Sequence, residues 1–311
     1  MVSILIPVYN RETLIEETIK SALNQSYNNI EVIVVDNKSI DNTWEILIKL
    51  AKQDNRIKIF QNETNIGPVR NWKRCIDKAS GEYGKILWSD DLIAPNFIER
   101  TLPFLSNNDI GFVFTGTEIF TDETNKKSSC YFIGNTGIYN SEQYINGVLS
   151  RGNYPVSPGC ALFRLKDIQE NLLVDIPNKV SSNFAMHAIG NDLLIFLLTA
   201  DKYKYFAFVN EKLSFFRAHI DSISIQSADG KLPLNYALAS AYFVEKYRND
   251  LVKKMNTELW LTIQKYKNGA RKYSLDQISH FYLTNTIYSF DFIYLTKRIL
   301  RKIISKFRYK K

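Results

Sequence analysis

The feature that most constrains this fold is a regular alternation of apolar and amphipathic segments over the first 90 residues. Four short apolar runs have the length of β-strands, and the segments between them repeat apolar residues every three or four positions, as helices do. This alternation predicts βαβ units, which build a mostly parallel sheet with right-handed crossovers. The predicted strands cover residues 2–8, 30–35, 57–61 and 83–88, and the predicted helices cover residues 12–25, 42–52 and 69–79.

The pattern is less regular after Asp91. We expect a Rossmann-like α/β body at residues 1–225, with helices flanking the sheet, and a helical extension at residues 226–311. The predicted elements of this part are a strand at residues 110–115, a helix at 191–200, one or two strands at 206–216 and a helix at 235–254.

The composition is that of a globular protein with a large core. Of the 311 residues, 45% are hydrophobic and 13% are aromatic, which excludes disordered and collagen-like chains. The three cysteines, Cys75, Cys130 and Cys160, form no C-x-x-C pair, which argues against a disulfide framework and against a cysteine zinc site. This cysteine usage favours a reducing, cytoplasmic compartment.

The positive charge of the chain is concentrated at its C-terminus. The formal net charge is +8, and the last 18 residues carry eight basic side chains and no acidic ones. The rest of the chain is therefore formally neutral. The excess charge is a local feature and not a property of the whole surface.

The C-terminal basic segment has the pattern of an amphipathic helix. From Phe292 onward, apolar residues recur at spacings of three and four, and most basic residues fall on the opposite arc. Such helices lie in membrane interfaces, where each Lys or Arg beside an anionic leaflet contributes about 1 kcal/mol. Docking on the body or on a second subunit is an alternative, whereas no nucleic-acid-binding fold accompanies the segment. The apolar residues are Phe292, Leu295, Ile299, Leu300, Ile303, Ile304 and Phe307, and the predicted membrane contacts are Arg298, Arg301, Lys302 and Lys306.

Neither end of the chain is expected to hold a signal peptide or a spanning helix. The apolar start at residues 1–9 lacks a basic region and runs directly into polar residues, which favours a buried strand. Residues 278–296 are rich in aromatic and aliphatic side chains but include His280, Asn285 and Asp291. This makes them too polar for a spanning helix of about 20 apolar residues.

Polar side chains follow three of the predicted strands, at the point where each strand ends. The first strand ends in PVYN, the second in VVDNKSIDNT and the fourth in WSDD, and the segment NIGPVRN lies between the last two. In a parallel sheet these clusters reach one edge, where the ligands of α/β proteins bind. Each alone has a structural explanation, because Asp caps helices and Asn-x-Gly forms turns. Their joint placement favours a ligand site.

The order and spacing of these four motifs resemble the nucleotide-sugar-binding half of family 2 glycosyltransferases, which have the GT-A fold. The resemblance covers residues Val2 to Phe120. Neither a GxxxxGKS/T phosphate loop nor a GxGxxG fingerprint is present in the sequence. Kinases and dinucleotide-dependent dehydrogenases therefore lose their main support.

The resemblance implies a site for a nucleotide-diphosphate sugar, most simply a UDP-sugar. In this site Asp36 accepts a hydrogen bond from the base, such as uracil N3–H, and Asp90 faces the ribose. Arg70 lies near the base or the phosphates. The nucleotide-binding residues implied in this way are Pro7, Val8, Tyr9, Asp36, Asn65, Gly67, Arg70 and Asp90.

The resemblance also implies a divalent cation, Mn²⁺ or Mg²⁺, that Asp91 binds against the diphosphate. Carboxylate oxygens are hard ligands that suit these ions. Family members often carry an acid two positions before Asp90, but here this position is Trp88. Weaker metal affinity, or a third ligand from elsewhere, is therefore part of the prediction. The segment RAHIDS is similar to the R-x-H-x-x-S segment of the family; His219 is the candidate extra ligand, and Arg217 or His219 closes over the diphosphate.

Inverting sugar transfer needs a carboxylate that accepts the proton of the attacking hydroxyl. In the family this acid begins a helix that follows the segment corresponding to residues 158–164 here. Asp192, in the sequence AIGNDLL, has that position, and we predict that it is the catalytic base. The alternatives are that Asp192 only caps the helix, or that His187 is the base, although this histidine is more typical of a structural residue.

The resemblance thus predicts a metal-dependent, inverting glycosyltransferase that builds a bacterial surface polysaccharide, such as a capsule or lipopolysaccharide. The sugar would pass from the nucleotide to a hydroxyl of a glycan or lipid-linked acceptor at the inner face of the membrane. A nucleotidyltransferase would need several cations near the first strand, where Arg11 alone is available. The other alternative is a membrane-bound, non-catalytic partner that binds a nucleotide or a sugar. It is compatible with Trp88, which stands where family members often have an acid.

Overall fold

A computed structural model describes residues 1–121, 127–218, 229–284, 287–298 and 300 of the chain. The chain divides into two compact units. The first comprises Met1–Asp175 and Asn183–Gln226, and the second comprises Ile176–Ser182 and Ser227–Lys311. The division predicted at residue 225 lies next to the second of these boundaries, whereas no sequence pattern marks residues 176–182 as part of the second unit.

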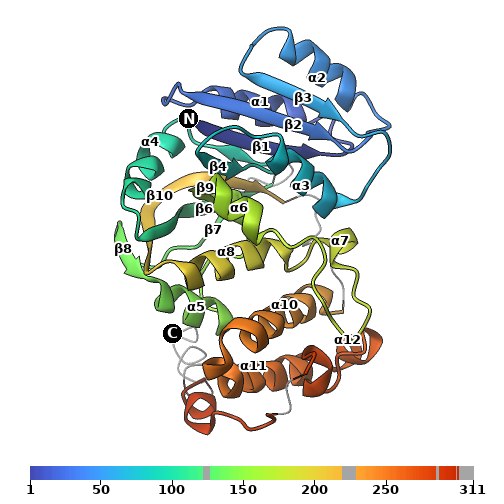
Figure 1. Ribbon diagram of the computed structural model, residues 1–311, viewed down its shortest axis with the longest axis vertical. Coiled ribbons are helices and arrows are strands. Elements are labelled where there is room, and N and C mark those ends of the chain that lie inside the picture. Colours follow the sequence, from blue (N-terminus) through green and yellow to red (C-terminus); the bar gives the residue numbers. More distant parts are fainter. Residues whose placement is uncertain (122–126, 219–228, 285–286, 299, 301–311) are drawn as a thin grey trace. The chain divides into compact units, whose positions relative to one another are not determined.

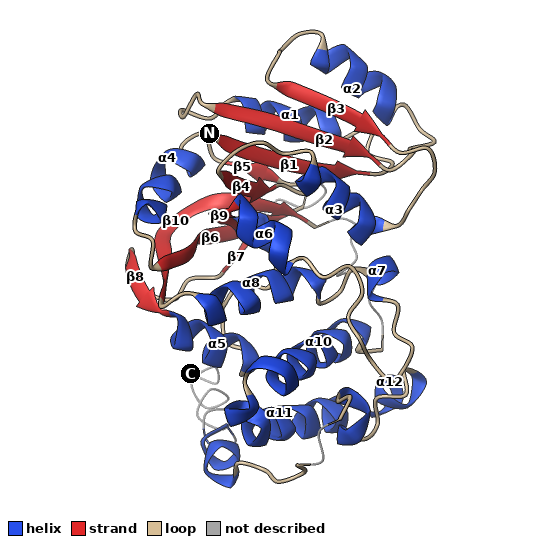
Figure 2. Cartoon of the chain, viewed as in Figure 1, coloured by secondary structure: helices blue, strands red, loops and turns tan. Residues whose placement is uncertain are grey.

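A ten-stranded sheet forms the centre of the first unit, and four parallel strands make up one side of it (Figure 2). The elements of this side are β1 Val2–Val8, α1 Ile15–Leu23, β2 Ile30–Asp36, α2 Thr43–Ala51, β3 Ile57–Gln61, α3 Pro68–Asp77 and β4 Tyr83–Ile86. The strand order is β3-β2-β1-β4. Every residue of β1 and β2 is buried, because α3 covers one face of these strands and α1 the other (Figure 1). Strands covered on both faces are continuous apolar runs, as the sequence shows.

The other side of the sheet is mixed. It consists of β5 Leu92–Ile93, β6 Ile110–Phe120, β7 Lys127–Cys130, β8 Gly137–Asn140, β9 Ala161–Arg164 and β10 Tyr205–Arg217. β6 and β10 are parallel, but β9 is antiparallel to both β4 and β6, and β5, β7 and β8 are antiparallel to their neighbours. The predicted α/β fold is confirmed, whereas the parallel arrangement does not extend across the sheet.

The remaining helices of the first unit follow, and an aromatic core fixes two of them on the sheet. These elements are α4 Phe97–Thr101, η1 Leu102–Ser106, α5 Ser141–Leu149, η2 Pro158–Cys160, α6 Leu165–Asn171, α7 Phe184–His187 and α8 Asn191–Lys202. Phe112 of β6 contacts four other rings at centroid distances of 5.0–5.6 Å. They belong to Tyr144 of α5, Phe163 of β9, Phe196 of α8 and Phe206 of β10. Such aromatic clusters bury large areas in defined geometries, which here fixes α5 and α8 on β6.

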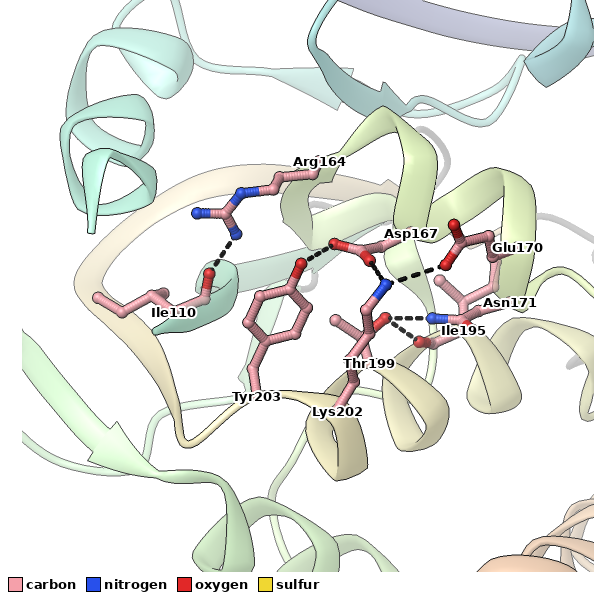
Figure 3. Close-up of polar contacts among 9 residues, drawn as sticks. All are labelled: Ile110, Arg164, Asp167, Glu170, Asn171, Ile195, Thr199, Lys202 and Tyr203. Carbon is pink, nitrogen blue, oxygen red and sulfur yellow. Dashed lines mark hydrogen bonds and ion pairs between the residues drawn. The ribbon is translucent and has the colours of Figure 1, made fainter. Parts of the chain in front are cut away.

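A buried carboxylate ties the end of α8 to α6 (Figure 3). Asp167 is fully buried and accepts hydrogen bonds from Lys202 Nζ at 2.8 Å and from Tyr203 Oη at 2.9 Å. Lys202 also lies 2.9 Å from the exposed Glu170, and the two acids raise the pKa of Lys202 above its ordinary value. Arg164 lies over the Tyr203 ring and donates to main-chain carbonyls in η1 and at the start of β6. These contacts fix the C-terminal end of α8 and thereby the direction of the helix.

The second unit is helical. Its elements are α10 Lys231–Tyr247, η3 Asn249–Leu251, α11 Val252–Lys265, α12 Lys267–Lys272 and η4 Ile278–Phe281. The prediction of one helix at residues 235–254 is wrong, because the chain leaves the helix at Arg248, which has a φ of −136° and a ψ of 58°. An ion pair of 2.9 Å between Arg248 and Asp250 closes this turn. In the part of the chain that the structure describes, no helix combines the length and the apolar character that a membrane span requires.

Asp167→Ala is expected to lower the free energy of unfolding by about 2–3 kcal/mol, because a lysine and a tyrosine lose their fully buried acceptor. Glu170→Ala, which removes the exposed partner of the same lysine, is expected to cost less than about 1 kcal/mol. Urea unfolding followed by tryptophan fluorescence measures both values. Equal losses in the two variants would contradict the assignment of Asp167 as the anchor.

Candidate active site

The ends of β1, β2 and β4 place three of the predicted motifs along one edge of the sheet. The register pairs Val8, the last residue of β1, with Asp36, the last residue of β2, and β4 runs parallel to β1 on its other side. Neighbouring strands are about 4.8 Å apart, so Asp36 and the loop after β4 are separated by two spacings, or roughly 10 Å. An extended ligand such as a nucleotide spans a distance of this size.

Hydrogen bonds and one ion pair join the three loops at this edge. The backbone N–H of Asn10 donates to Ser39 Oγ at 2.9 Å, and that of Arg11 donates to Thr43 Oγ1 at 2.8 Å. The Arg11 guanidinium lies 3.7 Å from a carboxylate oxygen of Asp90. The first loop is thus connected to the second loop and to the acid pair. The structure brings these motifs, which are far apart in the sequence, to one place.

Asp36 lies beneath its own loop. Its carboxylate accepts hydrogen bonds from the backbone N–H of Ser39 at 3.2 Å, from the Ser39 hydroxyl and from Gln61 Nε2 at 2.8 Å. Asp36 is 0% exposed, whereas Tyr9 and Ile40 in the surrounding loops are exposed. A base that hydrogen-bonds to Asp36 therefore needs part of the loop that covers it, such as the Ser39 hydroxyl, to move aside.

Asp90 and Asp91 are adjacent acids in a tight turn after β4. The N–H of Asp91 donates to the carbonyl of Trp88 at 3.1 Å, which closes the turn. The buried Asp91 carboxylate accepts a hydrogen bond from the backbone N–H of Arg217 at 2.9 Å. Burial and the charge of Asp90 raise the pKa of Asp91 well above its usual range. A cation beside the two acids would offset both effects.

The oxygen donors of this acid pair fit a divalent cation such as Mn²⁺ or Mg²⁺. These ions need few protein carboxylates and complete their shells with water and phosphate oxygens. Within the described ranges, no group of three or more His, Cys, Asp or Glu side chains is placed to hold a metal. The predicted extra ligand, His219, lies outside the described residues.

Arg217 holds the acid pair against α1 and β10. Its buried guanidinium donates to the Asp90 carbonyl at 3.0 Å and to Glu17 of α1 at 2.5 Å. It also lies 4.7 Å from the centre of the Phe120 ring. These contacts give Arg217 a part in positioning Asp90 and Asp91 that the sequence did not indicate. Its contact with a diphosphate stays a prediction.

A network of asparagines holds the NIGPVRN segment beside this edge. Asn62 donates to Asn37 at 2.8 Å, and Asn37 donates to Asn65 at 2.8 Å. Gly67 is the N-cap residue of α3 and has a φ of 83°, a backbone conformation that favours glycine. Arg70 lies on the exposed side of α3, 3.4 Å from Asp175. The nucleotide contacts of Asn65, Gly67 and Arg70 stay predictions.

Trp88, at the position where the family often has an acid, is packed into the loop structure. Its Nε1 donates to Ser157 Oγ at 2.9 Å, and its ring lies 4.6 Å from the ring of Trp72 in α3. Gly159 leaves room for this contact, because a Cβ there would lie 3.1 Å from the Trp88 ring. The acid loop is therefore fastened to the turn that precedes β9.

Asp192 lies in the first turn of α8. Its Oδ1 accepts hydrogen bonds from the N–H groups of Gly190 at 3.0 Å and of Leu193 at 2.9 Å. The N-cap residue of α8 is Gly190, so Asp192 is not itself the cap, and its role as the catalytic base stays a prediction. The pKa of Tyr131 is raised mainly by burial, with a smaller contribution from the charge of Asp192. The Tyr131 ring packs edge-on against Phe216 at 6.5 Å, next to the arginine that holds the acid pair.

A comparison of the chain with models of known protein families tests the family resemblance that the motifs indicate. Residues 3–172 match the family described as Glycosyl transferase family 2. The chain belongs to this family. The resemblance found in the motifs is confirmed, and the matched region extends past Phe120 to the end of α6.

Relatives and solved structures agree with this membership. A GalNAc(5)-diNAcBac-PP-undecaprenol beta-1,3-glucosyltransferase of Campylobacter jejuni is 41% identical over 90 residues, which are 29% of this chain and 29% of that protein. The chain spans less than half the length of the curated relatives that it matches. S. aureus TarS 1–349 in complex with UDP-GlcNAc is similar with a TM-score of 0.60 at 16% identity, over 87% of this chain and 72% of that one. The mannosyltransferase PcManGT from Pyrobaculum calidifontis, in complex with GDP-Man and Mn²⁺, gives a TM-score of 0.52 at 14% identity, over 89% and 75%.

Lys85 is a residue of this family 2 site that the sequence analysis missed. It lies in β4 and is fully buried; its Nζ donates to the Gly159 carbonyl and lies 4.5 Å from the centre of the Phe97 ring. Burial lowers the pKa of Lys85 to about 7, although Cys160 and Asp91 act in the opposite direction. A signal for it exists in the sequence, because a lysine inside a strand covered on both faces needs a specific partner.

Proposed function

We propose that the protein is an inverting glycosyltransferase that moves a sugar from a nucleotide-diphosphate sugar, in the first place a UDP-sugar, to a hydroxyl of a glycan or lipid-linked acceptor. The observation that carries this proposal is the meeting of Asp36, Asp90 and Asp91 at one edge of the parallel strands, joined through Ser39 and Arg11. Membership of family 2 supports it, as do the donor complexes of the structurally similar proteins.

Each acid has its own part of the donor in this proposal. Asp36 recognises the base, beside the backbone of residues 7–9, and Asp90 faces the ribose. Asp91 would hold Mn²⁺ or Mg²⁺ at the diphosphate. When bound, the cation supplies positive charge that offsets the negative charge of the leaving group.

Asp192 is the proposed catalytic base. The acceptor oxygen bonds to the anomeric carbon while the bond between that carbon and the diphosphate oxygen breaks, so the anomeric configuration is inverted. The Asp192 carboxylate takes the proton of the acceptor hydroxyl, and the electron pair of the broken bond leaves with the nucleotide diphosphate. The N–H groups of the first turn of α8 orient this carboxylate.

The proposed biological role is the synthesis of a bacterial surface polysaccharide, such as a capsule or lipopolysaccharide. The name of the Campylobacter relative specifies an undecaprenol-linked glycan, which supports a lipid-linked acceptor for this chain as well. One observation favours a second candidate, a non-catalytic partner that binds a nucleotide or sugar: Trp88 replaces the acid that is common in the family. A nucleotidyltransferase has less support, because Arg11, the cation near β1, is directed at Asp90.

Asp192→Asn is expected to lower the kcat of sugar transfer by about 100- to 10,000-fold, because the acceptor proton loses its base. The affinity for UDP in the presence of Mn²⁺, measured by calorimetry, should be unchanged. The substrate for this assay comes from a screen of UDP-, GDP- and dTDP-sugars. Asp201→Asn, an exposed acid at the other end of α8, is the control and should keep the wild-type rate.

Near-wild-type transfer by Asp192→Asn would place the base elsewhere. UDP binding by the wild-type protein, without turnover over a broad panel of donors and acceptors, would favour the non-catalytic partner. No binding of any of the three nucleotides would contradict the proposed donor site itself.

The proposal also places the enzyme on the inner face of the membrane, held there by the C-terminal basic segment. Arg301, Lys302 and Lys306 lie outside the described residues. Arg298 is described, and it pairs with Glu258 at 2.7 Å. In our proposal the contacts with anionic lipid therefore fall mainly to the basic residues after it, at about 1 kcal/mol each.

Deletion of residues 301–311 removes six basic side chains and leaves the Arg298–Glu258 pair in place. We expect it to weaken binding to phosphatidylglycerol vesicles by at least about 100-fold, because the electrostatic attraction is lost. Transfer to a soluble acceptor should be unchanged. Sedimentation with vesicles measures the binding, and equal binding by the full and the shortened chain would contradict membrane attachment through this segment.

A further inference from the structure

Exposed apolar side chains are concentrated between residues 287 and 300 of the second unit. Ile287 and Tyr288 are each 49% exposed, Phe292 and Ile293 are each 70% exposed, and Leu300 is 57% exposed. Single exposed apolar residues are common on proteins, but five within one short stretch of chain indicate an interaction site. We name these five side chains the docking face.

The backbone that carries the docking face is fastened to three successive buried residues of α11, namely Asn256, Thr257 and Glu258. Asn256 Nδ2 donates to two carbonyls of the segment, those of Ile287 at 2.7 Å and of Ser289 at 3.0 Å. Thr257 Oγ1 accepts a hydrogen bond from the next part of the segment, the N–H of residue 291, at 3.1 Å. These buried contacts hold the segment in place, so its apolar side chains are kept outward by the fold.

Glu258 determines which side of the following helix faces outward. Its carboxylate accepts hydrogen bonds from Tyr294 Oη and from Arg298, whose Nε lies at 2.7 Å and Nη2 at 3.1 Å. The helix at residues 292–298 begins after Asp291, which caps it by accepting the N–H of Tyr294 at 2.8 Å. Tyr294 and Arg298 therefore mark the inner side of this helix.

The outer side of this helix is mostly apolar and has a basic border. At 3.6 residues per turn, Phe292, Ile293 and Leu300 fall within about 100° of one another, on the side opposite Arg298, and the one polar residue in this arc is the exposed Thr296. The exposed Lys297 lies at the border of this apolar arc. The chain after Leu300 holds six basic residues and no acidic residue. An anionic bilayer offers both an apolar interior for the apolar side chains and negative headgroups for the basic border. An acidic soluble partner would match only the basic border.

We propose that the docking face enters the boundary between headgroups and acyl chains of an anionic membrane, while Lys297 contacts the headgroups. The inference rests on the membrane attachment in the proposed function and deepens it. It adds apolar insertion to charge attraction, and it assigns Arg298 to Glu258 and not to lipid. The inserted side chains are those of Ile287, Tyr288, Phe292, Ile293 and Leu300.

The test uses the full chain and vesicles of phosphatidylglycerol and phosphatidylethanolamine. The double variant Phe292→Ser/Ile293→Ser is expected to bind these vesicles about 10- to 100-fold more weakly, because the two most exposed apolar side chains of the face are lost. Ile138→Ser is the matched control, since Ile138 is an exposed aliphatic residue of β8 outside the docking face. It should bind like the wild type.

A charge-matched pair of neighbours tests the orientation of the helix. Lys297→Gln should weaken vesicle binding by about fivefold without changing the melting temperature. Arg298→Gln should leave binding within about twofold but lower the melting temperature, because a buried Glu258 loses its cation. Equal effects of the two substitutions on binding, with no loss of stability in either, would overturn the inward assignment of Arg298.

Wild-type vesicle binding by the double variant would overturn the docking face as a membrane surface. If the wild type is a dimer, the double variant is a monomer and both bind vesicles equally, the docking face mediates self-association and not membrane binding. These outcomes are separate from those of the proposed function: the deletion of residues 301–311 tests membrane attachment as such. Transfer to a soluble acceptor, expected to be normal in every variant of this series, tests the enzyme.

Discussion

The parallel pairing of β2, β1 and β4 is the constraint on which the rest of the site depends. A shift of one residue in this register would turn Asp36 to the opposite face of the sheet. Because β1 and β2 are apolar on both faces, a shifted register would still bury apolar side chains. A polar contact between the two strands specifies the correct register. Ser3 and Glu31 are opposite each other in the register and hydrogen-bond at 2.6 Å inside the sheet. Lys58 of β3 joins the same carboxylate at 2.6 Å, so one acid aligns three strands.

Charged groups are buried together at the active edge of the sheet. Lys85 and Arg217 are both buried near the acid pair, where Lys85 holds the turn at Gly159 and Arg217 holds the acid loop and Glu17. Taking such groups out of water is unfavourable unless each is hydrogen-bonded and faces opposite charge. Apolar side chains at these positions would give a stable fold at a lower cost. The burial of several charged groups at one edge of the sheet therefore indicates a binding role. A cationic and anionic ligand pair, such as a metal with a diphosphate, is the kind of partner that such an edge accommodates.

The first half of the fold could be predicted because its signals are local. The strands from β1 to β4 and the helices between them follow from apolar periodicity, and the edge at which Asp36 and Asp90 meet follows from parallel pairing. The second half could not be predicted in the same way, because β9 enters the sheet between β4 and β6, and no local pattern contains that pairing. The hydrogen-bond partners of the site residues could not be predicted from the sequence either. Arg217 lies 127 positions from the Asp90 carbonyl that it binds.

Two residues show what kind of information the sequence lacks. Trp88 suggested a weakened metal site, which stays a prediction, and the sequence did not indicate that Trp88 packs against Trp72 and donates a hydrogen bond to Ser157. The amphipathic pattern of the C-terminal helix indicated an apolar stripe through Phe292, but not that Glu258 binds Arg298 on the opposite side and so directs Phe292 and Ile293 outward. In each case the deciding contact joins residues far apart in the chain.

The central claim is that Asp36, Asp90 and Asp91 surround one nucleotide diphosphate and its cation. A crystal structure of the protein with UDP and Mn²⁺, with the anomalous signal of manganese located, tests it most directly. The account predicts a manganese peak between Asp91 and the diphosphate, and a uracil ring whose N3–H reaches Asp36 in place of the Ser39 hydroxyl. A nucleotide bound away from β1, or a manganese ion at other ligands, would contradict the account.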